Sequence, residues 1–253
     1  TRFSAIFLDE NGKALANQNI VFVINGVSYT KTTDENGMAS IGINLAPGSY
    51  VMESKNLATN ETVKNNVTVI STINPSNVVK LYKNGTHYYA TFIDGQGNAL
   101  ANKTVKFNIN GVFYTRNTNG SGIAKLNIAL YPDKYILTAY HPNGEAKGYN
   151  ITVLSTINSS DIIKYFRNGT QYYATFYDGM GNPLINETVR FNINGVIYEK
   201  RTNDKGTANL TISLYPGNYI LTAYHPNGEA KGYNISVLTT LIDNKDIDMY
   251  YRD

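Results

Sequence analysis

The feature that most constrains the fold is one phrase that recurs at a fixed distance along the chain. Residues 191–198 read Phe-Asn-Ile-Asn-Gly-Val-Ile-Tyr, and closely related phrases stand at 107–114 and 22–29. Two alternating apolar runs joined by Asn-Gly predict a β-hairpin, because a type I′ turn needs positive φ at both central residues and Asn and Gly tolerate it. The period of about 85 residues predicts a tandem array of three copies, each built around this hairpin.

Composition and turn spacing predict the fold class. Only 16% of the 253 residues are charged, 21 are Tyr, and neither Trp nor Cys occurs. Abundant Tyr, Val, Ile, Thr and Phe between regularly placed Gly and Asn favour an all-β chain. About seven short strands per copy, with turns about every eight to twelve residues, predict a β-sandwich. The expected repeats are 1–73, which lacks its opening strand, 74–158 and 159–242, and 243–253 is the opening strand of a further repeat or a donor strand.

Alternation within the third copy predicts which side chains face the core. The opening strand is expected at 161–167, and the hairpin strands follow further along. Because successive side chains of a strand point to opposite faces, Phe191 and Ile193 are expected to face the core, with Arg190 and Asn192 facing water. The segments Asn74-Pro75-Ser76 and Asn158-Ser159-Ser160 are expected to be short linkers that limit bending between copies.

A second structural signature is a tyrosine that follows a tight turn and enters an apolar strand. It resembles the tyrosine corner of immunoglobulin-like sandwiches, in which the hydroxyl bonds to nearby backbone. These tyrosines are expected to be core residues and not ligand contacts: Tyr50, Tyr135 and Tyr219.

Four repeated motifs carry a family resemblance that covers essentially the whole chain. They are Asp-x-x-Gly-Asn-Pro-Leu, Val-x-Phe-Asn-Ile-Asn-Gly-Val-x-Tyr, Thr-Asn-x-x-Gly-x-Ala-x-Leu and Leu-Tyr-Pro-Gly-x-Tyr-Ile-Leu-Thr-Ala. The combination resembles the Ig-like repeats of adhesin-like surface proteins of methanogenic archaea and, more distantly, transthyretin-like and Cna B-type sandwich modules. The resemblance implies extracellular, wall-associated or stalk-forming modules of an archaeal cell-surface protein with adhesive roles, and it implies no catalytic site. The first copy departs from the pattern at Val23 and Ser28 and in its last loop.

Several function classes are not expected. The formal charge of +3 is small and dispersed, and no run of Lys and Arg exists, so nucleic acid is not an expected partner. No apolar run is long enough to span a membrane, so direct membrane insertion is not expected. No nucleophile, base or carboxylate pair recurs in a cleft-forming context, so neither an enzyme nor a cofactor site is predicted.

The ends of the array allow two interpretations. Residues near the C-terminus match the opening strand 161–167 at an offset of about 85: Asp246, Ile247, Met249, Tyr250 and Tyr251. Either the sequence is a window cut from a longer array, or this strand completes the first sandwich of another copy and builds a fibre by β-strand addition. The expected partners are therefore neighbouring copies of the chain or further repeats of the same protein.

Eleven Asn-x-Ser/Thr acceptors are candidate glycosylation sites, about twice the number that the composition gives by chance. Most are expected at turns or on outward strand positions, where a glycan is tolerated. They are Asn60, Asn66, Asn84, Asn102, Asn119, Asn150, Asn158, Asn168, Asn186, Asn209 and Asn234.

The remaining polar motifs are interpreted as turns. His141 and His225 recur in Tyr-His-Pro-Asn-Gly-Glu, but one His and one carboxylate per copy fall short of a transition-metal ligand set, so no metal site is expected. The calcium-like Asp segments lack the later acidic ligands of an EF-hand and are interpreted as ordinary turns: Asp9, Asp34 and Asp94.

The Cna B resemblance raises the question of a Lys-Asn isopeptide cross-link. Lys80 and Lys164 on the opening strands, with Asn150 and Asn234 on the closing strands, are the residues that such a bond would use. Alternation argues against the bond, because Tyr233 and its neighbours on the core side push Asn234 outward.

A carbohydrate-binding, lectin-like module is the alternative function, with surface glycans as partners. Tyrosines on the second strand of two copies could stack on sugars, because an aromatic ring offers an apolar face with a polar edge. Adjacent residues of a strand alternate faces, so half of these four are expected in the core: Tyr88, Tyr89, Tyr172 and Tyr173. The favoured function is a non-enzymatic extracellular stalk or filament segment.

Overall fold

The all-β fold that the sequence predicts is confirmed. A computed structural model describes residues 1–242 and 249, and its regular structure consists of 22 β-strands. In this part of the chain, no helix has the length and apolar character needed to cross a membrane.

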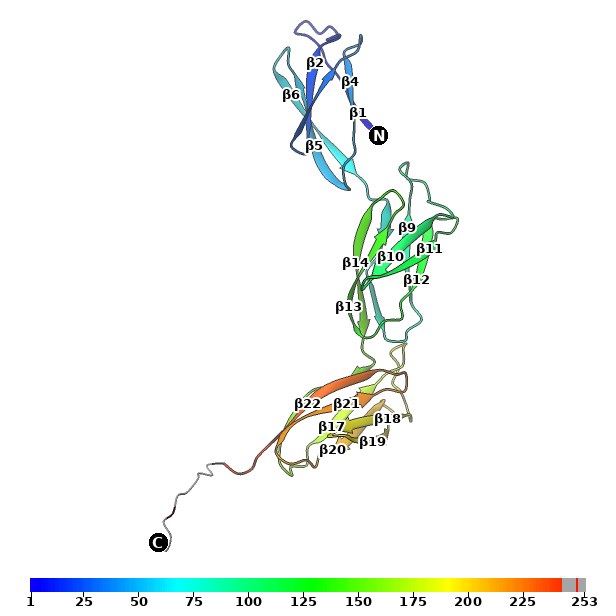
Figure 1. The fold of residues 1–253 in the computed structure, drawn as a ribbon, viewed down its shortest axis with the longest axis vertical. Helices are drawn as coiled ribbons and strands as arrows, with labels where there is room; N and C mark the ends of the chain where they lie inside the picture. Colours follow the sequence, from blue (N-terminus) through cyan, green and yellow to red (C-terminus); the bar gives the residue numbers. More distant parts are fainter. Residues whose placement is uncertain (243–248, 250–253) are drawn as a thin grey trace.

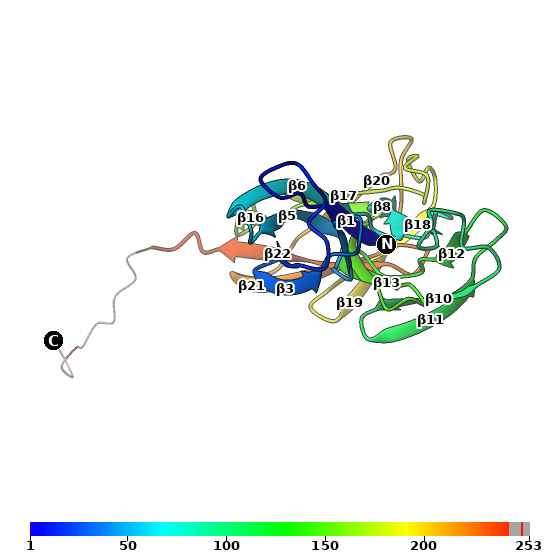
Figure 2. The same cartoon turned by 90° about the horizontal axis from the view of Figure 1, so that it is seen from above.

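The strands form three sandwich modules stacked in a row, as Figure 1 shows. Figure 2 looks along this row, so the modules overlap in that view. Module 1 contains six strands: β1 (Arg2–Ile6), β2 (Asn19–Ile24), β3 (Val27–Thr32), β4 (Met38–Gly42), β5 (Gly48–Asn56) and β6 (Glu61–Val69). Module 2 contains eight: β7 (Ile73–Pro75), β8 (Val78–Leu81), β9 (His87–Phe92), β10 (Thr104–Ile109), β11 (Val112–Asn117), β12 (Ile123–Asn127), β13 (Asp133–Tyr140) and β14 (Ala146–Leu154). Module 3 contains the equivalent eight: β15 (Ile157–Asn158), β16 (Ile162–Tyr165), β17 (Gln171–Phe176), β18 (Thr188–Ile193), β19 (Val196–Arg201), β20 (Thr207–Thr211), β21 (Gly217–Tyr224) and β22 (Ala230–Leu238).

Modules 2 and 3 share one topology. In module 2 a three-stranded sheet β12-β9-β7 faces a five-stranded sheet β11-β10-β13-β14-β8, and module 3 repeats this arrangement. β8 runs parallel to β14 and β16 runs parallel to β22, whereas the other pairs are antiparallel. In module 1 the described strands form β1-β4 and β3-β2-β5-β6, so its two sheets have no counterparts of β7 and β8 among the described residues.

The repeated Asn-Gly phrase closes a hairpin in every module, as predicted. Asn194 has φ 52° and Gly195 has φ 78°, which is the positive-φ pair that a type I′ turn requires. Phe191 and Ile193 are buried between the sheets and Arg190 is exposed, in agreement with the alternation, while Asn192 is half-buried. The hairpin therefore acts as a folding element, with its apolar face in the core.

The core of module 1 is smaller than the other two. Modules 2 and 3 each bury a cluster of fifteen hydrophobic side chains, whereas the cluster of module 1 has eight. An edge-to-face aromatic pair recurs in each core, with ring centroids 5.5 to 5.7 Å apart. Tyr88 and Tyr172 are fully buried in this pair, but their module 1 counterpart Phe3 is only half-buried. Among the described residues, the core of module 1 is thus less covered than the other two cores.

The tyrosine corners form as predicted, with one correction. The hydroxyl of Tyr50 donates to Ala46 O at 2.7 Å, and Tyr135 and Tyr219 make the equivalent bonds to backbone at 2.9 and 3.0 Å. All three rings are half-buried and pack against their clusters, so they are not fully buried core residues.

The segments expected to be linkers are partly strands. Ile73–Pro75 forms β7 and pairs with β9, and Ile157–Asn158 forms β15 and pairs with β17. The opening strand predicted at 161–167 is shorter and spans Ile162–Tyr165. Strands of two or three residues are too short to show alternation, and Pro75 suggests a break, so the sequence pattern could not reveal them.

Candidate functional site: the module junctions

The loop His-Pro-Asn-Gly-Glu begins with a buried histidine that holds two backbone segments together. In module 3, Nε2 of His225 lies 2.8 Å from Tyr177 O, and Asn227 N–H donates to Nδ1 at 2.9 Å. Because Nδ1 accepts, the neutral tautomer with its proton on Nε2 satisfies both bonds. Burial lowers the pKa of His225, although the Tyr177 carbonyl and Glu229 oppose this effect. The ring is therefore neutral near pH 7 and positions the loop.

The glutamate that closes the same loop binds the segment that enters the module. Glu229 is buried, and its carboxylate accepts Thr156 N–H at 2.8 Å, Thr156 Oγ1 at 2.5 Å and the hydroxyl of Ser155. Asn227 Nδ2 adds a bond to Thr156 Oγ1 at 3.0 Å. Hydrogen bonds to a charged acceptor are the strong class, so the carboxylate anchors the two residues directly before β15.

Module 2 repeats this network at its own entrance. The Glu145 carboxylate accepts Thr72 N–H at 2.8 Å and the hydroxyls of Thr72 and Ser71 at 2.5 Å. Burial acts to raise the pKa of Glu145, but the hydrogen bonds from Ser71 and Thr72 outweigh it, and the pKa is lowered. The carboxylate is thus ionised as the network requires. We call the two networks the junction clamps, made of Ser71, Thr72, His141, Asn143 and Glu145 and of Ser155, Thr156, His225, Asn227 and Glu229.

The residue after each clamped threonine is an isoleucine that packs in the core of the module the chain enters. Ile73 and Ile157 follow the clamped threonines directly, and both are buried in the clusters of the modules they enter. Backbone bonds extend the connection, since Ile93 N–H donates to Thr72 O at 3.0 Å and Tyr177 N–H donates to Thr156 O at 2.9 Å. The chain therefore passes from module to module without a free linker.

The junction between modules 2 and 3 has a further contact between loops. Asn84 Nδ2 donates to Gly179 O at 2.8 Å. A Cβ on Gly179 would lie 3.0 Å from the backbone of Lys83 and Asn84, which is tighter than ordinary van der Waals contact. Two turns from different modules therefore meet backbone to backbone at this point.

Sequence reasoning placed His141 and His225 in turns, which is correct, but it missed their burial and the partners of Glu145 and Glu229. A signal was present, because Ser-Thr-Ile recurs at 71–73 and 155–157, at the same distance before each loop. Nothing local shows that residues more than 70 positions apart bind one another.

The structure does not bring the proposed cross-link residues together. Lys164 Nζ donates to Ile212 O at 2.7 Å and to two further carbonyls, and Lys80 Nζ donates to Ile128 O at 2.8 Å. Burial lowers the pKa of Lys80. Asn150 and Asn234 are exposed on the outer face, where Asn234 Nδ2 donates to Asp161 Oδ2 at 2.9 Å. The reason is the alternation of side chains along adjacent strands.

Ten of the eleven glycosylation candidates are exposed: Asn60, Asn66, Asn102, Asn119, Asn150, Asn158, Asn168, Asn186, Asn209 and Asn234. Asn84 is half-buried because its side chain is engaged at the junction. Of the four tyrosines considered for sugar stacking, Tyr88 and Tyr172 are buried, while Tyr89 and Tyr173 are exposed.

Most of the expected donor strand lies outside the described residues. Asp246, Ile247, Tyr250 and Tyr251 lie outside the described residues, and Met249 is exposed. Among residues 1–242 and 249, no group of three or more His, Asp or Glu side chains could hold a metal ion. The Asp94 carboxylate instead accepts the amides of Gln96 and Asn98 at 2.9 Å, as in an ordinary Asx turn.

No protein-family model matches the chain. No curated protein matches it either. Among solved structures, a protein of the mixed-linkage glucan utilization locus of Bacteroides ovatus, in complex with a mixed-linkage heptasaccharide, is 14% identical to this chain. The match covers 94% of this chain and 71% of that chain, with a TM-score of 0.26.

The bacterial integrin-binding protein invasin is 18% identical, with coverage of 94% and 60% and a TM-score of 0.26. The α-2-macroglobulin of Escherichia coli is 12% identical, with coverage of 97% and 22% and a TM-score of 0.36. Identities and TM-scores this low place the chain in no family.

Proposed function

We propose that this chain is a non-enzymatic extracellular stalk segment whose role is to hold an adhesive or structural element at a distance from the cell surface. The junction clamps carry the proposal. A spacer must resist bending at its joints. The segment that enters each of modules 2 and 3 is held by a carboxylate with three donors, by backbone pairing and by a buried isoleucine.

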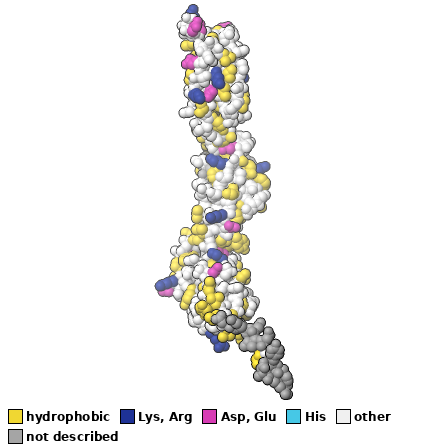
Figure 3. Space-filling model, turned by 90° about the vertical axis from the view of Figure 1, so that its left-hand side faces the viewer, with side chains coloured by type: hydrophobic (Ala, Val, Ile, Leu, Met, Phe, Trp, Pro, Cys, Tyr) yellow, Lys and Arg dark blue, Asp and Glu magenta, His cyan; other side chains and the backbone are white. Residues whose placement is uncertain are grey.

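The surface supports the same proposal. On the face shown in Figure 3, positive and negative side chains are scattered among polar and apolar ones, without a gathered charge that would favour nucleic acid or an anionic membrane. The exposed sequons on all three modules would allow glycans to cover the stalk. We propose in addition that the chain is exposed at the surface of an archaeal cell and carries glycans.

Small-angle scattering tests the stalk directly. The wild-type chain is expected to scatter as a rigid rod with one maximum dimension. The double variant Glu145→Ala/Glu229→Ala is expected to give a shorter mean dimension and a broader distance distribution, whereas the exposed control Glu35→Ala/Glu199→Ala keeps the rod. A wild-type profile that already fits freely jointed modules would refute the proposal. Protease shaving of intact cells, followed by peptide mapping and intact mass, tests surface location and glycans.

A carbohydrate-binding module is a second candidate, favoured by one observation. Tyr89 and Tyr173 are exposed at equivalent positions of β9 and β17, where an aromatic ring could stack on a sugar. Saturable binding on a glycan array that Tyr89→Ala/Tyr173→Ala abolishes would support this function. If the wild-type chain binds no glycan, the carbohydrate-binding function is refuted and the stalk function remains.

A further inference from the structure

A shallow groove recurs on the outer face of the larger sheet. In module 2 it has a volume of about 320 Å³ and lies between β13 and β14, and in module 1 it has a volume of about 280 Å³ and lies between β5 and β6. Both grooves are lined by residues at the same five positions of the repeat: Lys134, Tyr135, Ile136, Asn150 and Thr152 in module 2, and Ser49, Tyr50, Val51, Asn66 and Thr68 in module 1. The groove is therefore a property of the repeat.

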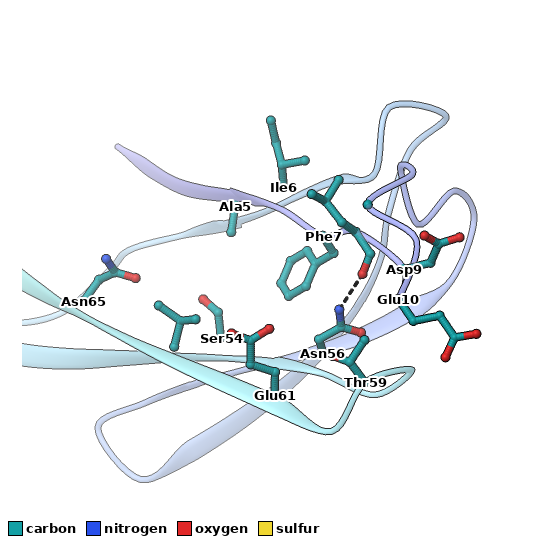
Figure 4. Close-up of a pocket in the computed structure, with 13 residues that line it drawn as sticks. Ala5, Ile6, Phe7, Asp9, Glu10, Ser54, Asn56, Thr59, Glu61 and Asn65 are labelled. Atoms are coloured by element: carbon teal, nitrogen blue, oxygen red, sulfur yellow. Dashed lines mark hydrogen bonds between the residues drawn. The ribbon is translucent and has the colours of Figure 1, made fainter.

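The asparagine of an Asn-x-Ser/Thr acceptor lines each groove. Asn150 and Asn66 do so directly, and Asn234 has the same position on β22. In module 1 the preceding residue, Asn65, lies at the groove between the two sheets (Figure 4), so alternation turns Asn66 to the outer face. The three acceptors thus occupy equivalent strands and the same face of the sheet.

Each of these asparagines faces an exposed aliphatic residue on the neighbouring strand. The register pairs Asn150 with Ile136, Asn234 with Ile220, and Asn66 with Val51. Ile136 is 59% exposed and Ile220 is 66% exposed. The outward positions two residues away on the same strands are polar: Lys134, Thr138, Asn218 and Thr222. Facing side chains of antiparallel strands have Cβ atoms about 5 Å apart, so each acceptor lies directly beside an aliphatic surface.

In modules 2 and 3 a second aliphatic residue lies on the other side of the acceptor. β8 places Val79 beside Thr152, and β16 places Ile163 beside Ser236. Val79 and Ile163 are both exposed, and Thr152 and Ser236 are the hydroxyl residues of the two acceptors. Exposed aliphatic side chains that gather around one point mark a binding surface.

A glycine keeps the surface beside each isoleucine open. A Cβ on Gly148 would lie 3.5 Å from Cγ2 of Ile136, and a Cβ on Gly232 would lie 3.4 Å from Cγ2 of Ile220. Neither glycine has a positive φ, so backbone conformation does not require this residue type. Glycine inside a strand weakens the strand, and it often marks a place where a ligand approaches closely.

Module 1 differs at this point. Lys64 takes the place of the glycine, and its Nζ lies 2.9 Å from Oε1 of Glu53 on the neighbouring strand. The open surface with two aliphatic residues is thus a feature of modules 2 and 3.

We propose that Asn150 and Asn234 carry N-linked glycans, and that the first pyranose ring of each glycan lies over the glycine and packs its C–H face on Ile136 or Ile220. A sugar fits this surface, because a pyranose presents C–H groups on one face and hydroxyl groups at its rim, where the neighbouring residues are polar. The glycan then covers the aliphatic surface and stabilises the module. This inference rests on the proposed glycosylation of the stalk and adds the sites and the role of the glycans.

The modification is a group transfer catalysed by a separate enzyme, with a lipid-linked glycosyl phosphate as donor. Nδ2 of the asparagine attacks the anomeric carbon, the bond from that carbon to the phosphate oxygen breaks, and the phosphate leaves with the electron pair. One Nδ2 proton passes to a base of the transferring enzyme, so Nδ2 keeps one hydrogen. In module 3 this hydrogen can still be donated to Asp161 Oδ2, which lies 2.9 Å from Asn234 Nδ2.

Two other acceptors show the contrast. Asn119 lies in a turn, where its Oδ1 accepts the amides of Ser121 and Ile123 at 3.0 and 2.9 Å. Asn84 is half-buried, and its Nδ2 donates to Gly179 O at the junction. A glycan on Asn119 would project from the turn, so this acceptor is the control for the packing of the sugar.

Peptide mapping of the chain recovered from the cells that make it tests the two sites. The peptides that contain Asn150 and Asn234 should carry a glycan mass in most molecules. If these peptides are unmodified while other acceptors carry glycans, this inference is overturned and the proposed glycosylation stands. If no acceptor carries a glycan, both are overturned, and scattering still decides the stalk function separately.

Calorimetry of variants made in the same cells tests the packing. Asn150→Gln should lower the melting temperature of module 2 by about 5 °C, because Ile136 loses its cover. In an Ile136→Thr background, which keeps the acceptor, the same change should have little effect. Ser121→Ala removes the acceptor at Asn119 and should leave the melting temperature unchanged in both backgrounds. Equal losses from Asn150→Gln in the two backgrounds would overturn the proposal.

Methyl NMR gives a local readout that does not depend on stability. The Ile136 and Ile220 methyl groups should show nuclear Overhauser effects to ring protons of the first sugar. These effects should disappear in Asn150→Gln for Ile136 and remain for Ile220. A glycosylated chain without such effects at either isoleucine would refute the packing.

Discussion

Replacing the Glu229 carboxylate by an amide is expected to lower the stability of module 3 more than the same replacement at an exposed glutamate. The carboxylate accepts three donors from Ser155 and Thr156, and Glu229 is buried. In Glu229→Gln, the amide nitrogen cannot accept, so at least one buried donor loses its partner and the remaining bonds lose their charge assistance. An unsatisfied buried donor costs about 1–3 kcal/mol, and the expected total loss is about 2 kcal/mol.

A loss of about 2 kcal/mol should lower the melting temperature of a module of this size by about 10 °C. Calorimetry of the full chain should show one transition displaced while the others stay. Hydrogen exchange followed by mass spectrometry gives the local readout, because the Thr156 amide should exchange faster. Glu199→Gln is the matched control, since Glu199 is exposed on β19. If the Glu229→Gln and Glu199→Gln variants have the same melting temperature and the same exchange rate of the Thr156 amide, the carboxylate does not hold the junction.

Three further predictions concern modules 2 and 3. Gly179→Ala places a Cβ 3.0 Å from the backbone of the neighbouring module and should broaden the distance distribution in solution scattering, whereas Gly95→Ala, with no atom within 4 Å, should not. Burial lowers the pKa of His225 in the folded chain below the 6.5 of the unfolded chain. The stability that the neutral ring contributes is therefore complete above pH 6.5 and declines as the pH falls toward the pKa of the folded chain. The urea midpoint should fall in the same way, and a constant midpoint between about pH 7 and 5 would contradict this prediction. Gly206→Ala combines a positive φ with a Cβ that would lie 2.6 Å from a backbone carbonyl oxygen, and it should destabilise module 3 by about 3 kcal/mol. Gly228→Ala has a positive φ but open space around the Cβ, and it should cost about 1 kcal/mol. Equal urea midpoints of the two variants would refute the steric reasoning.

Local signals predicted the parts of the fold that depend on neighbours in sequence. The Asn194-Gly195 turn, the inward Phe191 and the bond from Tyr219 to backbone four residues away all follow from turn chemistry and alternation. Each of these features is decided within a few residues, so a single sequence carries enough information. The repeat then extends them to the whole chain.

The candidate site depended on long-range pairing. The clamp joins Thr156 to Glu229, and neither residue alone differs from an ordinary turn or linker residue. β15 is two residues long and shows no period of its own, so it exists only because β17 offers an edge. Buried charge and short strands are stabilised by their surroundings, which local propensity does not encode.

The sequence by itself determined the array of hairpins, the faces of their strands and the polar turns, because these depend on backbone sterics and on the period of two. Only the tertiary structure decided that Glu229 and Glu145 hold the incoming chain. The physical reason is that a hydrogen bond between distant residues forms only after the sheets have brought its donor and acceptor together.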